Sequence, residues 1–188
     1  LAKNTQDEHQ VVATHTHPRS FSEPNGYRDA YFGALVSHLA ETGSKSLVLG
    51  LLVERPREQF RKLKSLEFGL PILPLESYFT LKDLAACVLQ AIRIYIRPLH
   101  PSGTVEIDGL DLGCLVEQAV HDAHNTGDAL LNLHVYYCAR RLARPTRVGR
   151  CLYPYENRAW EKMLLMGIRA ASPQTQMVGY QHTSITPS

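Results

Sequence analysis

The segment that most constrains the fold of this chain is Ser46–Val53, which reads Ser-Leu-Val-Leu-Gly-Leu-Leu-Val. An almost unbroken apolar run of this length is typical of a strand that helices cover on both faces, as in parallel sheets. The run is too short to cross a bilayer, and the longer apolar stretch at 84–96 is interrupted by Arg93. The segment therefore predicts an interior strand of a parallel sheet.

The rest of the chain alternates between strand-type and helix-type patterns. Apolar runs typical of strands occur at 9–14, 46–53, 70–75, 151–153 and 177–180, and helical periodicity occurs at 27–43, 56–69, 80–97, 111–125, 128–144 and 158–171. Pro71 and Pro74 favour an edge position or an irregular conformation for the third strand. This alternation predicts an α/β fold, with a doubly wound, mostly parallel, Rossmann-like sheet and right-handed crossovers.

The two consecutive helices at 111–125 and 128–144 interrupt the alternation. We expect them to form an inserted helical pair within about 100–147, with 100–109 as a linker. Thr80 is a suitable N-cap for the preceding long helix, and the wide apolar stripe of that helix predicts that it is well buried. The 188 residues suit a single domain over 1–188.

Composition excludes several classes of function. The net charge of +2 gives no support for nucleic acid as a partner or for a general attraction to membranes. The chain has neither a G-x-G-x-x-G loop nor a Walker loop, so a nucleotide held by a phosphate-binding loop is not expected. The four cysteines show no C-x-x-C spacing, which predicts buried free thiols in a reducing cytoplasm.

His15 and His17 form an H-x-H pair at the end of the first predicted strand. Alternate residues of a strand share a face, so the two imidazoles could contact one ligand. Histidine suits proton transfer because its pKa lies near working pH. The pair could also be ordinary loop residues, and no third ligand for a metal is identifiable, so no metal site is predicted.

A second group of polar residues follows the last two predicted strands. Glu156 and Asn157 come after the strand at 151–153, Trp160 lies in the next helix, and Gln181 and His182 end the strand at 177–180. Ligands of open parallel sheets bind beyond the carboxyl ends of the strands, so these residues are predicted to surround one crevice with His15 or His17. Glu156 could instead cap the helix, and Trp160 could be a packing residue.

Five arginines, including Arg150, fall between residues 140 and 150. They could complement the dipole at the end of the preceding helix, or they could form a patch that binds phosphate, because arginine holds phosphate through two hydrogen bonds.

The segments Tyr-Pro-Tyr-Glu-Asn-Arg-Ala-Trp-Glu-Lys at 153–162 and Gly-Tyr-Gln-His at 179–182 also carry a resemblance. They resemble the end of the N-terminal domain of bacterial glycosyltransferase-like proteins of surface carbohydrate biosynthesis, which have two Rossmann-like domains in the GT-B arrangement. The resemblance implies transfer of a sugar from a nucleotide donor to a surface-polysaccharide acceptor. It implies catalytic roles for His15, His17 and His182, and substrate binding by Glu156, Asn157, Trp160, Gln181 and Arg150.

The same resemblance implies that a C-terminal donor-binding domain is missing and that only the full-length protein binds a nucleotide-sugar; no cofactor is expected in this part. The implied partner is a carbohydrate or lipid-linked sugar acceptor, and the implied location is the cytoplasm, with peripheral association at the inner membrane face as an alternative. Two other interpretations remain open: a non-catalytic Rossmann-like binding or assembly module, and a flavodoxin-like regulatory domain. The second is disfavoured because neither an acidic cluster nor a phosphate loop follows the first strand.

Overall fold

The computed structural model describes residues 9–21, 27–42, 45–65, 70–96, 105–125 and 128–181. Its centre is a five-stranded sheet in the order β3-β2-β1-β6-β7, in which every pair of neighbours is parallel. The strands are β1 (His9–Thr16), β2 (Ser46–Leu52), β3 (Ile72–Pro74), β6 (Val148–Pro154) and β7 (Gln176–Tyr180). The predicted α/β fold with a parallel, Rossmann-like sheet is confirmed.

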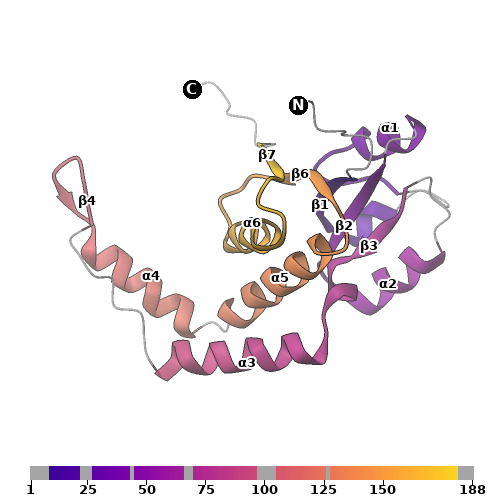
Figure 1. Ribbon diagram of the computed structural model, residues 1–188. Helices are drawn as coiled ribbons and strands as arrows, with labels where there is room; N and C mark the ends of the chain where they lie inside the picture. Colours follow the sequence, from indigo (N-terminus) through magenta and orange to yellow (C-terminus); the bar gives the residue numbers. More distant parts are fainter. Residues whose placement is uncertain are drawn as a thin grey trace.

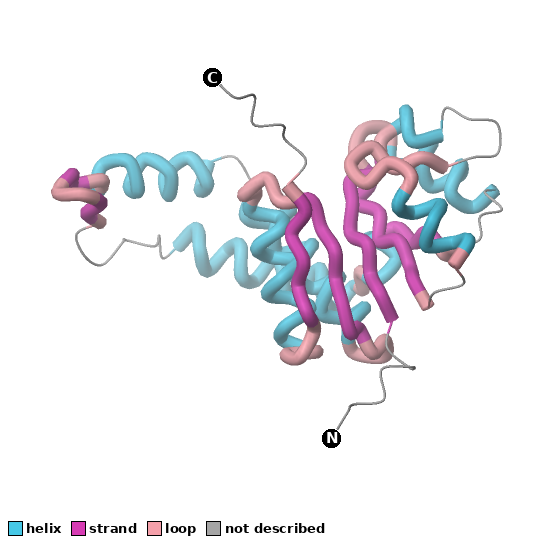
Figure 2. Tube along the Cα trace, turned by 90° about the horizontal axis from the view of Figure 1, so that it is seen from above, coloured by secondary structure: helices cyan, strands magenta, loops and turns pink. Residues whose placement is uncertain are grey.

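Helices cover both faces of this sheet (Figures 1 and 2). One face carries α1 (Leu35–Glu41) and α2 (Pro56–Ser65), and the other carries α5 (Asp128–Ala143) and α6 (Ala159–Ala171), with α3 (Leu81–Ile96) packed outside α5. The chain winds from β1 through β2 to β3 in one direction, and β6 and β7 then lie on the opposite side of β1. The direction of winding therefore reverses between β1 and β6.

The apolar segment around Leu49 occupies the predicted place. Strand β2 lies between β1 and β3, and Val48 and Leu49 are fully buried although they point to opposite faces. Strand β3 is an edge strand and ends at Pro74, as expected for a segment that contains two prolines. The predicted interior position of β2 and the predicted edge position of β3 are both confirmed.

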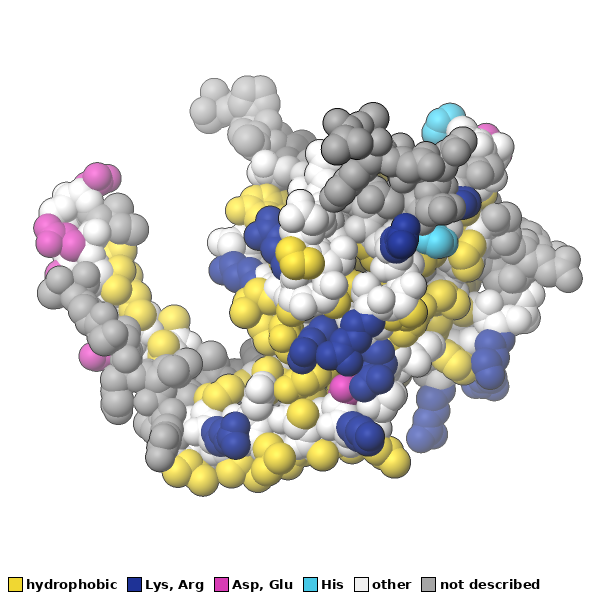
Figure 3. Space-filling view, in the orientation of Figure 1, with side chains coloured by type: hydrophobic (Ala, Val, Ile, Leu, Met, Phe, Trp, Pro, Cys, Tyr) yellow, Lys and Arg dark blue, Asp and Glu magenta, His cyan; other side chains and the backbone are white. Residues whose placement is uncertain are grey.

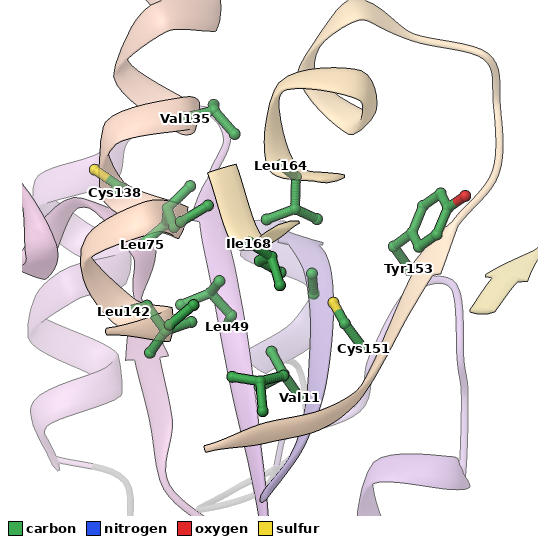
Figure 4. Close-up of a cluster of buried hydrophobic side chains, with 14 of the residues drawn as sticks. Val11, Leu49, Leu75, Val135, Cys138, Leu142, Cys151, Tyr153, Leu164 and Ile168 are labelled. Carbon is green, nitrogen blue, oxygen red and sulfur yellow. The ribbon is translucent and has the colours of Figure 1, made fainter. Parts of the chain in front are cut away.

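The larger core lies between the sheet and the pair α5 and α6. Figure 4 shows side chains from both layers pointing toward one another, among them Leu49 from β2, Leu142 from α5 and Ile168 from α6. Helices α5 and α6 approach closely at Gly167, where a Cβ atom would lie only 2.4 Å from the Tyr136 carbonyl oxygen. Helix α5 is thus part of the main body of the domain.

Helix α1 begins later than its periodicity predicts. The helical pattern starts at Tyr27, but residues 27–34 form turns, and the helix begins at Leu35. The cause is the buried carboxylate of Asp29, whose Oδ1 accepts hydrogen bonds from the backbone N–H groups of Tyr31 and Phe32, both at 2.8 Å. Asp side chains favour such local turns over helix.

The start of α3 is correctly predicted, whereas its burial is not. The Thr80 backbone N–H donates to Asp83 Oδ2 at 3.0 Å, and the Asp83 N–H donates to Thr80 Oγ1 at 3.3 Å, which is a reciprocal cap. The apolar stripe of α3, however, faces solvent: Leu81 is 83% exposed and Ile96 is 69% exposed. The prediction that this helix is well buried is wrong.

Beyond α3 the chain forms a projecting unit, which we call the arm (residues 105–125). It consists of a hairpin, β4 (Glu106–Ile107) and β5 (Leu110–Asp111), followed by α4 (Gly113–Asn125). The segment that forms most of the hairpin was predicted to be a linker. The turn of the hairpin is Asp108-Gly109, a favoured hairpin sequence, and both residues have a positive φ. Both views show the arm standing away from the sheet (Figures 1 and 2).

None of the helices in the described ranges has the length and apolar character needed to cross a bilayer.

Candidate functional site

A pocket of about 410 Å³ opens beyond the carboxyl ends of β1 and β2, near the reversal of winding between β1 and β6. This is where ligands of open parallel α/β sheets bind. Its walls come from β1, the end of β2, the turn after β3, and the amino-terminal parts of α5 and α6. The lining residues that carry polar side chains are His15, Glu76, Asn132, His134, Arg158 and Trp160.

His15 lies at the centre of an aromatic cluster at the end of β1. The centroid of its ring is 4.5 Å from that of Trp160 and 5.9 Å from that of Tyr31. The Tyr31 hydroxyl lies 3.4 Å from His15 Nδ1, a long hydrogen bond whose direction depends on the tautomer. Because Nδ1 is engaged in this way, Nε2 is the ring nitrogen that can interact with a ligand.

The surroundings of His15 favour its neutral form. Burial lowers the pKa of His15 below 6.5, the nearby His17 lowers it further, and the charge of Glu156 acts in the opposite direction. A histidine with a lowered pKa is uncharged at neutral pH. Its ring can then accept a hydrogen bond or a proton from a bound molecule.

Two other titratable residues of the pocket are shifted toward their uncharged forms. Burial lowers the pKa of His134, whose ring packs edge-on against Phe79 at 4.6 Å. Removal from water raises the pKa of Glu76, although the residue as a whole is exposed and its Oε1 accepts a 3.4 Å hydrogen bond from the Leu52 N–H. The pocket therefore disfavours charge at His15, at His134 and at Glu76.

A buried hydrogen-bond network around Asp29 holds Tyr31 beside His15. Besides the two backbone N–H groups that shape the turn, Asp29 accepts hydrogen bonds from the Tyr27 hydroxyl at 3.0 Å and from Thr14 Oγ1 at 3.2 Å. Burial, followed by the charge of Asp29, raises the pKa of Tyr27, so this phenol stays protonated and continues to donate. Asp29 is thus a positioning residue for the aromatic cluster.

Glu161 fixes the loop that leads from β6 into α6. Its buried carboxylate accepts hydrogen bonds from the backbone N–H groups of Glu156 at 3.0 Å and Arg158 at 3.1 Å. Between them, Asn157 has a φ of 59°, a conformation that Asn tolerates better than most residues. The acidic side chain that caps this helix is therefore Glu161, and Glu156 remains near His15.

The structure brings some of the predicted site residues together. His17 lies beside His15, with ring centroids 6.3 Å apart, and the ring centroid of Trp160 lies 4.5 Å from that of His15. The Nε1 atom of Trp160 is buried without a hydrogen-bond partner among the described residues. With Glu156 close enough to influence the pKa of His15, these four residues form one cluster.

Other predicted residues lie apart from this cluster. Asn157 and Gln181 are exposed, the first in the loop before α6 and the second after β7. Arg150 lies toward the amino end of β6, where its Nε donates to Gln176 Oε1 at 3.1 Å. His182 lies outside the described residues. The roles proposed for these four residues remain predictions.

The arginines at the end of α5 are partly engaged in ion pairing. Arg141 donates through Nε and Nη2 to the two carboxylate oxygens of Asp83, both at 2.9 Å, which ties α5 to the start of α3. Arg140 and Arg144 line a small pocket of about 60 Å³ beside this pair. Within the described ranges, no group of three or more His, Cys, Asp or Glu side chains is arranged to hold a metal ion.

Sequence reasoning missed several pocket residues. Glu76, Asn132 and Arg158 line the pocket but were not identified as site residues. Glu76 follows the third predicted strand directly, so the rule that placed Glu156 and His182 at the carboxyl edge could have found it. Asn132 carried no comparable signal, because it lies on a helix whose position in space depends on packing.

Comparisons with known proteins do not identify a family. No family model matches the chain, and no curated protein matches it. A solved structure of a CDPS (cyclodipeptide synthase) from Fluoribacter dumoffii is similar, with a TM-score of 0.45 and 10% identity over 93% of this chain and 89% of that chain. At this level of similarity the match supports no argument about the function of this chain.

The resemblance to glycosyltransferase-like proteins is wrong. None of the comparisons with family models, curated proteins or solved structures returned a glycosyltransferase. The motif at 153–162 that carried the resemblance has a local structural explanation, because Glu161 organises the loop and Trp160 packs against His15. The nucleotide-sugar donor and the missing second domain were implied by that resemblance alone.

Proposed function

We propose that this domain binds a small, uncharged organic molecule in the pocket at the carboxyl edge of its sheet. The observation that carries the proposal is the pocket of about 410 Å³ with the half-buried His15 at its base, at the position in the fold where parallel sheets bind ligands. The volume lies within the range of ordinary small-molecule sites.

The chemistry of the lining supports an uncharged ligand. The walls include Leu51, Leu75 and Val135, and the pKa shifts of His15, His134 and Glu76 all favour neutral side chains. The lining also contains the cation Arg158, but Arg158 and Glu76 are both exposed, so a charged ligand would lose its hydration without gaining a buried counter-charge. A molecule with an apolar face and a hydroxyl group fits this lining, and both aromatic alcohols and sugar rings meet that description.

Trp160 makes the proposal directly testable, because it is the single tryptophan of the chain and lies in the pocket. Benzyl alcohol, benzylamine and benzoate have similar shapes but differ in charge, and methyl glucoside presents a sugar ring. In fluorescence titrations at pH 7.5, benzyl alcohol should change the emission with roughly millimolar affinity, as is usual for so small a ligand. Tighter binding of benzylamine or benzoate would contradict the proposal.

A matched pair of variants separates pocket binding from surface binding. His134→Asp introduces a carboxylate into the pocket and should abolish the response to benzyl alcohol. His38→Asp makes the same change at an exposed position of α1 and should leave the response unaltered. Equal responses from the two variants would show that the probe binds elsewhere.

Proton-transfer catalysis is a second candidate function. One observation favours it: the same pocket lowers the pKa of a histidine and raises the pKa of a carboxyl group, an arrangement that suits a base and an acid. In such a reaction, Nε2 of neutral His15 would take a proton from a bound hydroxyl group. With 4-nitrophenyl acetate the hydroxyl group is that of water: its oxygen attacks the acetyl carbon as His15 takes the proton, and acetate and 4-nitrophenolate are released. The wild-type protein should catalyse this hydrolysis faster than His15→Gln.

The four cysteines support a location in a reducing compartment such as the cytoplasm. All four are free, and Cys87, Cys138 and Cys151 are buried. Unpaired thiols are usual where disulfides do not persist. Fractionation of cells that express the protein would test this location.

A further inference from the structure

Helix α3 presents an apolar surface that no described part of the chain covers. Its exposed side chains recur at helical spacing along one side, and Figure 3 shows them along the lower edge of the molecule. They are Leu81, Leu84, Val88, Leu89, Ile92 and Ile96. Each of the six is at least 41% exposed, and a contiguous exposed apolar surface of this kind marks an interaction site in many proteins.

The surroundings of this stripe are basic. Lys82 and Arg93 are eleven positions apart, about three helical turns, so they flank the stripe on the same side. Neither forms an ion pair within the described residues, and Arg144, which directly follows α5, adds another exposed cation nearby. Figure 3 shows Lys and Arg side chains gathered above the apolar edge. We call this surface the α3 face.

The arm has the opposite charge. Residues 105–125 contain five carboxylates and neither Lys nor Arg; because the whole chain carries +2, the remaining residues carry +7. Figure 3 shows acidic side chains gathered on the arm. Helix α4 also exposes apolar surface, with Leu115 63% exposed, and Glu117 and Asp122 lie on either side of its stripe.

The arm is poorly supported by its own chain. Helix α4 has 13 residues and makes only sparse contact with α5. Isolated helices of this length are marginal in water, so most of their stability must come from packing an apolar side against another element. A surface that covers α4 and carries positive charge would provide that packing.

We propose that two copies of this chain associate by exchanging arms, with the acidic arm of each copy docked on the basic α3 face of the other. Helices α3 and α4 are of similar length, with 16 and 13 residues, and their apolar stripes have complementary flanking charges. Exchange in both directions gives a closed, two-fold symmetric dimer. In this dimer the apolar stripes of α3 and α4 are covered in both copies.

Two other occupants fit less well. Direct pairing of two α3 helices in antiparallel orientation would place Lys82 of one copy beside Arg93 of the other, which is repulsive. An anionic membrane would attract the α3 face but repel the five carboxylates of the adjacent arm. Of the three arrangements, the exchange of arms is the one that satisfies both surfaces at once.

Charge-reversal variants of the full chain test the exchange. Two double variants each remove the attraction between the acidic arm and the basic α3 face. The face variant carries Lys82→Glu and Arg93→Glu, and the arm variant carries Glu117→Lys and Asp122→Lys. The control Arg57→Glu with Arg61→Glu makes the same number of changes on exposed positions of α2. Sedimentation equilibrium measures the mass of each protein, and circular dichroism checks that each variant folds.

The wild-type protein and the control should show twice the chain mass of 21.1 kDa. The face and arm variants should each raise the dimer Kd at least tenfold, and an equal mixture of the two should restore the dimer, because each basic surface then meets an acidic one. A monomeric wild-type protein at about 100 μM, well above the Kd of most specific interfaces, would overturn the proposal. The proposal would also be overturned if the mixture of the face and arm variants did not form the dimer, or if the protein bound as a monomer to vesicles of phosphatidylserine and phosphatidylcholine.

Discussion

Helices α6 and α3 are both amphipathic, yet they place their apolar sides in opposite environments. In α6, Leu164 and Ile168 are fully buried against the sheet and α5. In α3, Leu89 is 58% exposed and Ile92 is 48% exposed. Periodicity locates the apolar side of a helix, but it does not say whether the partner of that side belongs to the same chain.

The largest expected difference between the two helices concerns truncation of a leucine. Leu164→Ala leaves a cavity in the main core and should lower the free energy of unfolding by about 2–5 kcal/mol. Leu89→Ala at low protein concentration, where the chain is monomeric, should change it by less than about 0.5 kcal/mol. Urea denaturation measures both, and similar losses would show that α3 is buried within the monomer.

A smaller effect is expected when atoms are added to the two helices. Gly167→Ala would place a Cβ atom 2.4 Å from the Tyr136 carbonyl oxygen and 2.9 Å from the Ala139 Cβ, so α5 and α6 must separate. This should cost about 1–3 kcal/mol. Ala85→Leu adds more atoms on the exposed side of α3 and should be tolerated in the monomer. A stable Gly167→Ala protein would contradict the close packing of α5 and α6.

The attachment of α3 to the domain should depend on its polar side. Asp83→Asn weakens both the cap with Thr80 and the ion pair with Arg141, and should cost about 1–2 kcal/mol at pH 7. The hydrogen bond from Arg141, the largest cause, lowers the pKa of Asp83 from 3.8 to about 2. The wild-type advantage should therefore persist above pH 3.8 and disappear as the pH falls toward 2. An advantage that survives below pH 2 would exclude this ion pair as its source.

The smallest expected effect is the pH dependence contributed by the pocket. The pKa values of His15 and His134 are lower in the folded protein than the usual 6.5, so the unfolded chain binds more protons as the pH falls below that value. Stability should decrease from pH 6.5 downward until both folded-state pKa values are passed. In His15→Gln the decrease should be smaller. An unchanged slope in that variant would show that His15 titrates normally.

Much of the fold was predictable because strands and helix starts depend on local patterns. The buried strand around Leu49, the edge strand ending at Pro74 and the cap at Thr80 all follow from residues within one element. The start of α1 was not predictable, because a single carboxylate, that of Asp29, competes with the helix for two backbone N–H groups. The exposure of α3 was not predictable either, because periodicity identifies the apolar side of a helix but not the element that packs against it.

The candidate site was predictable in part for a similar reason. Residues that follow parallel strands meet at one edge, which located His15 and the loop before Trp160. The function inferred from the motif in that loop was wrong, because Glu161 and Trp160 have structural roles that any such loop could share. Pocket residues on α5, such as His134, depend on how that helix packs across the sheet.

The most direct test of the central claim is an NMR pH titration of His15, assigned with His15→Gln, in the presence and absence of benzyl alcohol. The account predicts a midpoint below pH 6.5 and a shift of the His15 Cε1–H resonance when benzyl alcohol is added at pH 7.5, with a smaller shift once the imidazole is protonated. A midpoint at or above 6.5, or a His15 resonance that does not respond to the probe, would contradict a neutral histidine at the base of a ligand pocket.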